Sequence, residues 1–204
     1  NFWIMEQQAG ITGWECMGRN PAPGQLGLWT AQSVAHGADT VVYFRWRSCL
    51  FGTEQYWHGI LPHSGKPGRT YQELKELFAK LRPYMEEMQG ITTPAQVGIV
   101  YSYDQNYALQ IQPQNPKLTY LGQVMKYYTA LYRANVPVDF LSDQADFSKY
   151  KLLIAPLQYL TNPALEEKYR EYVAQGGHLV LTMRTGVKDD TNLCHPDILP
   201  GGLS

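Results

Sequence analysis

The sequence predicts an α/β fold with mainly parallel sheets, arranged in two parts. Short apolar, β-branched runs alternate along the chain with segments whose apolar residues recur at helical spacing, and this alternation is typical of βαβ units. A Gly-Ile-Thr-Thr-Pro segment at 90–94 separates the two parts. All five tryptophans precede residue 58, whereas eleven of the fifteen tyrosines follow residue 100, so the two parts also differ in composition.

The composition excludes several classes of protein. With 204 residues the chain is shorter than the roughly 250 residues of a complete (β/α)8 barrel. Its 17 basic and 18 acidic residues give a net charge of −1, without the basic excess that a nucleic-acid partner requires. No run of 18 apolar residues predicts a membrane span, and the first residues lack a signal-peptide layout. Three widely spaced cysteines, Cys16, Cys49 and Cys194, form no disulfide framework and favour a cytoplasmic location.

The first part is predicted to be one βαβ unit followed by a long loop and a long helix. Right-handed crossovers make the two strands of such a unit parallel neighbours. In the long helix, Thr70 and Glu73 fit a capping box, Pro83 predicts a kink and Gly90 an end. The elements predicted are a buried strand at 2–6, a helix at 26–35, a buried strand at 40–44, a loop rich in Trp, His, Glu and Gly at 45–69, and a helix at 70–88.

The second part is predicted to alternate strands and helices around one sheet. Pro137 places its strand at a sheet edge or at the start of the strand, and Asn135 ends the preceding helix. Asn162 and Pro163 form a helix cap and a first-turn proline. No Gly-rich phosphate loop is present, so this part shows no readable chemistry. The predicted strands are 96–101, 136–141, 151–155 and 178–182, and the predicted helices are 118–133 and 163–174.

Candidate functional residues follow the two strands of the first part. Glu6 ends the first strand, and in barrel folds the face at the carboxyl ends of the strands carries the active site. The alternative is an ordinary charged residue at a strand end. Trp14, in the next loop, offers an aromatic face suited to the apolar C–H face of a sugar ring; alternatively, it fills a crevice.

The segment after the second strand combines the same kinds of group. Phe44 reaches the same end of the sheet, and Arg45 and Arg47 point to opposite sides of an extended segment, so one of them can face a carboxylate, either in a site or in a structural ion pair. In the following loop Glu54 and His58 flank an amide and an indole. Each sugar hydroxyl needs a donor and an acceptor, so this mixture is typical of carbohydrate sites. A Glu–His pair has too few ligands for zinc, and no metal or other cofactor is expected.

These residues resemble glycoside hydrolase family 42 β-galactosidases. The first part, 1–90, is similar to the C-terminal end of that family's (β/α)8 TIM barrel. The second part, 95–204, resembles the family's trimerisation domain, which has a flavodoxin-like, glutamine-amidotransferase-like α/β fold. The motifs that carry the resemblance are Phe-Trp-Ile-Met-Glu-Gln at 2–7, Trp14, Thr-Val-Val-Tyr-Phe-Arg-Trp-Arg at 40–47, and the segment 54–59.

The resemblance implies a role for each candidate residue. Many family members have two residues between the substrate-binding Glu and His, whereas three separate Glu54 from His58 here, so Trp57 is an alternative to His58. The implied roles are the catalytic nucleophile for Glu6, the aromatic surface against which galactose packs for Trp14, a site-lining side chain for Phe44, and hydrogen bonds to galactose hydroxyls for Glu54 and His58.

The implied activity is retaining hydrolysis of terminal β-D-galactosides by a homotrimer. The family's acid/base glutamate, in an Asn-Glu pair on the fourth barrel strand, has no counterpart in this sequence, so the chain by itself is expected to be inactive. One alternative is a non-catalytic oligomerisation module. Another, an amidotransferase-like enzyme in the second part, is disfavoured because no cysteine stands on a strand-to-helix turn.

Overall fold

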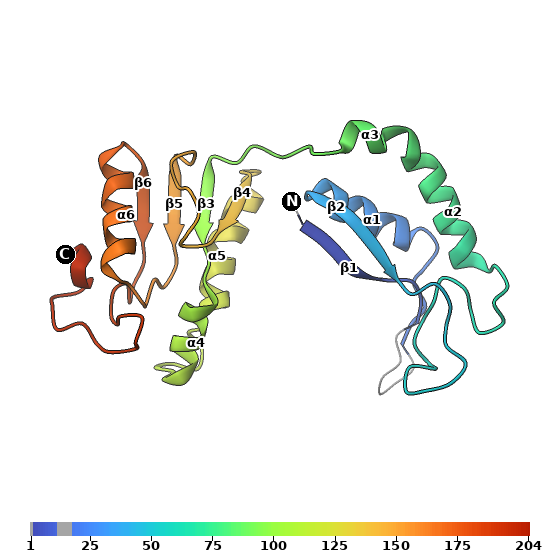
Figure 1. Cartoon of the computed structure of the whole chain (residues 1–204), viewed down its shortest axis with the longest axis horizontal. Coiled ribbons are helices and arrows are strands. Elements are labelled where there is room, and N and C mark those ends of the chain that lie inside the picture. Colours follow the sequence, from blue (N-terminus) through green and yellow to red (C-terminus); the bar gives the residue numbers. More distant parts are fainter. Residues whose placement is uncertain (1, 12–17) are drawn as a thin grey trace. The chain divides into compact units, whose positions relative to one another are not determined.

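The computed structural model describes residues 2–11 and 18–204, and it divides into two compact units between Thr93 and Pro94 (Figure 1). Unit 1 contains a two-stranded sheet and unit 2 a four-stranded sheet. Every strand pair in both sheets is parallel. The predicted α/β class with parallel sheets is therefore confirmed. No helix in the described ranges combines the length and apolarity needed to cross a membrane.

Unit 1 begins with the predicted βαβ unit. Strand β1 (Phe2–Gln8), helix α1 (Gln25–Ala35) and strand β2 (Ala38–Phe44) follow one another, and β1 lies parallel to β2. Helix α1 packs on β2, where the Thr30 hydroxyl contacts the Tyr43 hydroxyl. The chain then passes through a long loop into α2 (Arg69–Leu81), a 3-10 turn (Arg82–Tyr84) and the short α3 (Met85–Met88).

The long helix of unit 1 confirms one sequence prediction and corrects another. Pro83 does interrupt it, because the 3-10 turn at this proline separates α2 from α3. The capping box is wrong: α2 has Gly68 at its N-cap and no side-chain cap. The Glu73 carboxylate instead accepts hydrogen bonds from the Gly24 backbone N–H at 3.0 Å and from Arg69 Nη1 at 2.8 Å. A long-range contact to the loop before α1 therefore replaces the local cap.

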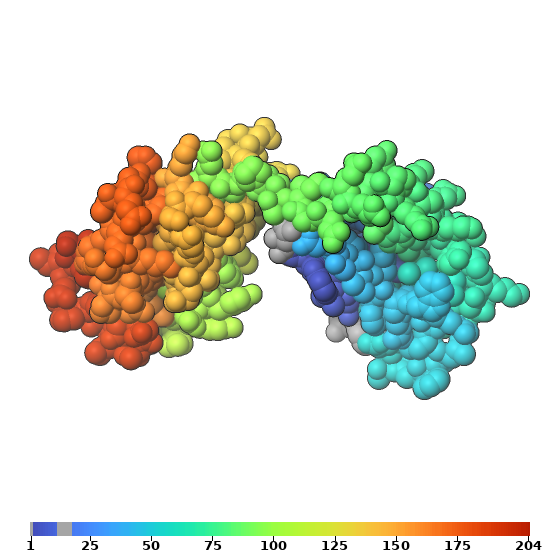
Figure 2. All heavy atoms as spheres, turned by 45° about the horizontal axis from the view of Figure 1, so that its top comes forward, coloured from blue at the N-terminus to red at the C-terminus, as the bar shows by residue number. Residues whose placement is uncertain are grey.

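The burial predicted for β1 is wrong. Trp3 and Met5 are 62% and 60% exposed, and the deep blue atoms of β1 lie at the surface in Figure 2. Within the described residues β1 pairs only with β2, so its side chains lack the neighbours that bury a central strand. An apolar strand with an unpaired edge is a surface on which another strand can pair.

Unit 2 is a four-stranded parallel sheet in the order β4-β3-β5-β6 with helices packed against it (Figure 1). The edge position of β4 confirms the prediction from Pro137. Helix α4 has no predicted counterpart. The elements are β3 (Val97–Val100), α4 (Tyr103–Ile111), α5 (Tyr120–Arg133), β4 (Val138–Leu141), β5 (Leu152–Ala155), α6 (Pro163–Ala174), β6 (His178–Leu181) and a final 3-10 turn (Gly201–Leu203).

Two apolar clusters form the core of unit 2. Ile99 and Ile154 belong to one cluster, whereas their neighbours Val100 and Leu153 belong to the other. Since successive side chains of a strand point to opposite faces, the clusters lie on the two faces of the sheet. The predicted cap of α6 is present, because Asn162 Oδ1 accepts a hydrogen bond from the Leu165 N–H at 2.9 Å.

Candidate active site

Four of the five predicted site residues lie near or beyond the carboxyl ends of the parallel pair in unit 1. Gln8 of β1 is in register with Phe44 of β2, so both strands end at the same level. Glu6 lies two residues before the end of β1, and its side chain is exposed. Glu54 and His58 belong to the loop after β2. Trp14 lies outside the described residues.

His58 joins the loop after β1 to the end of β2. It is only 6% exposed, and its Nδ1 lies 3.1 Å from the backbone oxygen of Ile11. Its ring meets Phe44 edge to face, with centroids 6.3 Å apart, and the Trp57 ring lies beside it at 5.2 Å. The sequence alternatives His58 and Trp57 are thus in direct contact, and His58 is the one that touches Phe44.

The surroundings of His58 favour a neutral imidazole. Burial lowers the pKa of His58, and backbone contacts to Ile11 and Phe44 together with the charge of Glu6 only partly offset that effect. A neutral ring has one donor and one acceptor nitrogen. Because the Ile11 carbonyl can only accept, Nδ1–H donates to it and Nε2 is the acceptor. Its Nε2 is buried and has no hydrogen-bond partner in the described part of the chain, which is an uncommon state for a buried polar atom.

Glu54 is held by Arg45. Arg45 Nη1 donates to Glu54 Oε2 at 2.8 Å, and Arg45 Nη2 contacts Cys49 Sγ. The guanidinium carbon lies 5.3 Å from the centre of the Phe44 ring, within the range of a cation–π contact. Of the two arginines considered from the sequence, Arg45 faces the carboxylate, whereas Arg47 donates to the backbone oxygen of His63. No pattern in the sequence predicts the contact with Cys49.

Backbone hydrogen bonds hold the loop in place beyond β2. The segment 45–48 lies beside 59–61 and is joined to it by bonds from Ile60 N to Arg45 O, Leu61 N to Trp46 O and Ser48 N to Leu61 O, at 2.7, 2.8 and 3.0 Å. The approach is closest at Gly59, where a Cβ atom would lie 2.4 Å from Ser48 N and 2.6 Å from Arg47 C. Only glycine fits there without displacing backbone, so Gly59 permits the close approach of the segment next to His58.

We predict that Gly59→Ala destabilises unit 1 by about 1–3 kcal/mol, because the added methyl group meets backbone atoms that cannot rotate away. Urea unfolding followed by tryptophan fluorescence measures the change, since all five tryptophans lie in this part. Gly68→Ala is the matched control: a Cβ there has open space and φ is −111°. Equal unfolding midpoints for the two variants would contradict the tight approach.

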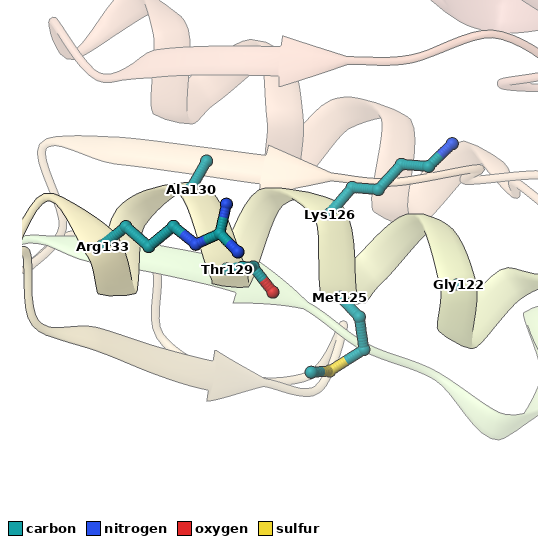
Figure 3. Close-up of a pocket in the computed structure, with 6 residues that line it drawn as sticks. All are labelled: Gly122, Met125, Lys126, Thr129, Ala130 and Arg133. Atoms are coloured by element: carbon teal, nitrogen blue, oxygen red, sulfur yellow. The ribbon is translucent and has the colours of Figure 1, made fainter.

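Other places in the structure offer less chemistry. Among residues 2–11 and 18–204, no group of three or more His, Cys, Asp or Glu side chains is arranged to hold a metal ion. A shallow hollow in unit 2 follows the outer face of α5 and contains no carboxylate, imidazole or thiol (Figure 3). It is lined by Gly122, Met125, Lys126, Thr129, Ala130 and Arg133.

Side-chain hydrogen bonds join the segments that follow β3 and β5 in unit 2. In open parallel sheets ligands bind at the carboxyl ends of the strands, where the strand order reverses; here that point lies between β3 and β5. The Gln105 side chain accepts from the Leu160 N–H at 2.7 Å and donates to the Leu160 oxygen at 3.0 Å. Helix α4 is thereby joined to the segment after β5 by a pair of side-chain hydrogen bonds.

Comparison with known proteins gives a separate match for each of the two units. Residues 1–84 match the family model described as beta-galactosidase, and residues 95–204 match the one described as beta-galactosidase trimerisation domain. A β-galactosidase of Clostridium cellulovorans is 42% identical over 204 residues, which are 100% of this chain and 31% of that protein. The chain thus spans about a third of that relative's length.

Solved structures resemble the whole chain. The crystal structure of a β-galactosidase from Bacillus circulans sp. alkalophilus matches with a TM-score of 0.91 and 34% identity, over 98% of this chain and 30% of that one. A glutamate-to-alanine catalytic mutant of a family 42 β-galactosidase from G. stearothermophilus matches with a TM-score of 0.88 and 30% identity, over 96% and 29%. These matches confirm the fold class predicted from the resemblance, the end of a TIM barrel followed by an α/β domain. The chain therefore belongs to the β-galactosidases of glycoside hydrolase family 42.

Proposed function

We propose that this chain is the part of a retaining β-galactosidase that carries the nucleophile, followed by the trimerisation domain. In this proposal residues 1–90 are the C-terminal end of the catalytic TIM barrel and residues 95–204 are the domain that assembles the enzyme as a homotrimer. The observation that carries the proposal is the gathering of Glu6, Phe44, Glu54 and His58 at one end of the parallel pair β1–β2, where barrel enzymes place their active sites.

The reaction we propose is a double displacement at the anomeric carbon of a terminal β-D-galactoside. The Glu6 carboxylate attacks that carbon, the bond to the leaving oxygen breaks, and an acid protonates that oxygen. Water, deprotonated by the same group now acting as base, then attacks the galactosyl–Glu6 ester and frees Glu6. The net configuration is retained, because each of the two displacements inverts the carbon.

The remaining predicted residues bind the sugar in this proposal. Trp14 packs against the apolar face of galactose, and Phe44 lines the pocket. Glu54 and the Nε2 of neutral His58 accept hydrogen bonds from galactose hydroxyls. The partly exposed Glu54 carboxylate, of which Arg45 holds Oε2, and the unpartnered Nε2 of His58 support these roles.

We expect the acid/base carboxylate to come from outside these 204 residues. The Glu54 carboxylate of this chain is bound to Arg45 and has a sugar-binding role in our proposal. The free thiols of Cys49 and Cys194 support a location in the reducing cytoplasm.

The 204-residue chain alone should not hydrolyse 4-nitrophenyl β-D-galactoside. General acid–base catalysis alone raises the rate of a reaction by about 10²- to 10⁴-fold. In our proposal the chain lacks the carboxylate that supplies it. The assay compares the isolated chain with the full-length protein that contains it, at equal molar concentration. Robust turnover by the isolated chain would show that a complete catalytic pair lies within it, contrary to the proposal.

A second candidate function, a purely non-catalytic oligomerisation module, draws on unit 2. Gln105 joins the segments that follow β3 and β5 by hydrogen bonds to Leu160, and residues 95–204 match a trimerisation model. Sedimentation at several concentrations tests self-association, because a trimer dissociates on dilution with a characteristic concentration dependence. A strict monomer would count against the module and against the proposed homotrimer.

A further inference from the structure

Arg45 makes contacts that a surface ion pair does not need. Its Nη1 donates to Glu54 Oε2, its Nη2 contacts Cys49 Sγ, and its guanidinium lies over the Phe44 ring. Its side chain is 25% exposed, and its Nε is buried. Three sides of the guanidinium are therefore fixed before any ligand arrives, and the carboxylate bound to it is fixed as well.

We propose that Arg45 is a positioning residue that holds the Glu54 carboxylate so that its second oxygen faces a galactose hydroxyl. This inference rests on the proposed function and assigns Arg45 a part in it that the resemblance does not. Arg45 occupies only Oε2; among the described residues Oε1 accepts no hydrogen bond. The Glu54 side chain is 37% exposed, so Oε1 remains accessible to a ligand.

Two unpartnered polar atoms support a ligand at this place. Arg45 Nε and His58 Nε2 are the buried side-chain atoms of the described residues that lack hydrogen-bond partners, and both side chains contact Phe44. Buried polar groups are normally paired, and leaving one unpaired costs free energy. Together around Phe44, beside the partly exposed Glu54 side chain, these two atoms leave hydrogen bonds that groups other than the described residues would complete.

The geometry also explains why an arginine suits this position. A planar guanidinium presents several N–H groups in a fixed fork, so Arg45 holds Glu54 and Cys49 at once. A lysine ammonium would keep the charge but not the fork, and would leave the Glu54 carboxylate free to rotate. Displacing a binding group by about 1 Å can cost roughly 100-fold in rate, so a loosely held Glu54 should be visible in the kinetics.

Arg47 provides a matched control on the same segment. It is the same residue type two positions along the chain, but it is exposed and donates to the backbone oxygen of His63 at 2.7 Å. Arg47→Ala therefore removes the same atoms from the same segment while leaving the Arg45–Glu54 pair intact.

The test measures kcat and KM of the full-length enzyme with 4-nitrophenyl β-D-galactoside for Arg45→Ala, Arg45→Lys, Glu54→Gln, the Arg45→Ala/Glu54→Gln double variant and Arg47→Ala. We expect Arg45→Ala to lower kcat/KM by about 10- to 100-fold with a raised KM, and Arg45→Lys to recover part of the loss. Because Arg45 acts through Glu54, adding Arg45→Ala to Glu54→Gln should cost little more. Arg47→Ala should stay within about twofold of the unsubstituted enzyme.

The outcomes separate this inference from the proposed function. A purely structural Arg45 would reduce the amount of folded enzyme and leave KM unchanged, which circular dichroism and KM together reveal. That result, or fully additive losses in the double variant, would overturn the positioning role while leaving the galactosidase assignment intact. An unsubstituted full-length enzyme without β-galactosidase activity would overturn both.

Discussion

Replacing Glu6 with glutamine should lower kcat of the full-length enzyme by about 10⁴-fold or more, a loss typical of removing a residue that forms the covalent bond. Glutamine has nearly the same shape but is a far weaker nucleophile, so the sugar should still bind. Glu6 is exposed at the carboxyl end of β1, so the substitution leaves the core of unit 1 intact. Turnover of 2,4-dinitrophenyl β-D-galactoside measures the effect.

Chemical rescue distinguishes a nucleophile from a structural carboxylate. In Glu6→Gly, added azide should enter the vacated space, attack the anomeric carbon from the face where the carboxylate stood and expel dinitrophenolate, which needs no protonation. The product should be the α-galactosyl azide, since a single displacement inverts the configuration. Glu76→Gln, an exposed carboxylate on α2, should retain full activity. A Glu6→Gln variant as active as Glu76→Gln would reject the assignment.

The second large effect concerns the stability of unit 2. Leu153 lies on β5 between β3 and β6, is 0% exposed, and packs with Leu165, Tyr169 and Tyr172 of α6. Leu153→Ala should lower the free energy of unfolding of unit 2 by about 2–5 kcal/mol, because it removes buried methyl groups and leaves a cavity. Urea titration followed by far-UV circular dichroism measures the change.

A leucine of the same unit provides the control for this substitution. Leu193 is 67% exposed, so Leu193→Ala should change the free energy of unfolding by no more than about 0.5 kcal/mol. Tryptophan fluorescence reports on unit 1 alone, because no tryptophan lies beyond residue 57. Similar losses for the two leucine variants would contradict the core described for unit 2.

The start or end of a helix can be predicted from the sequence where contacts within a few residues determine it. Asn162 and Pro163 predict the start of α6 because the cap is made within four residues, and Asn135 adopts the left-handed conformation, with φ of 55°, just beyond α5. The residue pattern does not predict helix α4, because its buried side chains include the polar Gln105 beside Ala108 and Leu109, whereas its apolar residues Tyr103, Tyr107 and Ile111 are exposed. The signal that could have located it is Ser102, whose hydroxyl caps the helix by accepting from the Asp104 N–H.

Contacts and burial that depend on residues far apart in the chain cannot be predicted from the local sequence. Thr70 and Glu73 have the spacing of a capping box, yet Glu73 pairs with Gly24, 49 residues away. The apolar residues of β1 predict burial, but burial depends on neighbouring strands that residues 2–11 and 18–204 do not provide. In the candidate site, the residue types of Glu54 and His58 indicate sugar binding, whereas the choice of Arg45 over Arg47 as partner of Glu54 requires the folded loop.

Trapping the covalent intermediate tests the central claim most directly. A 2-deoxy-2-fluoro-β-galactoside with a dinitrophenolate leaving group should inactivate the full-length enzyme, because fluorine slows both displacements while the good leaving group speeds the first. Peptide mass spectrometry should then find the fluorogalactosyl group on the tryptic peptide that ends at Arg19, and fragmentation should place it on Glu6 rather than Glu15. A label on Glu15, or on any residue other than Glu6 in an active enzyme, would contradict the account.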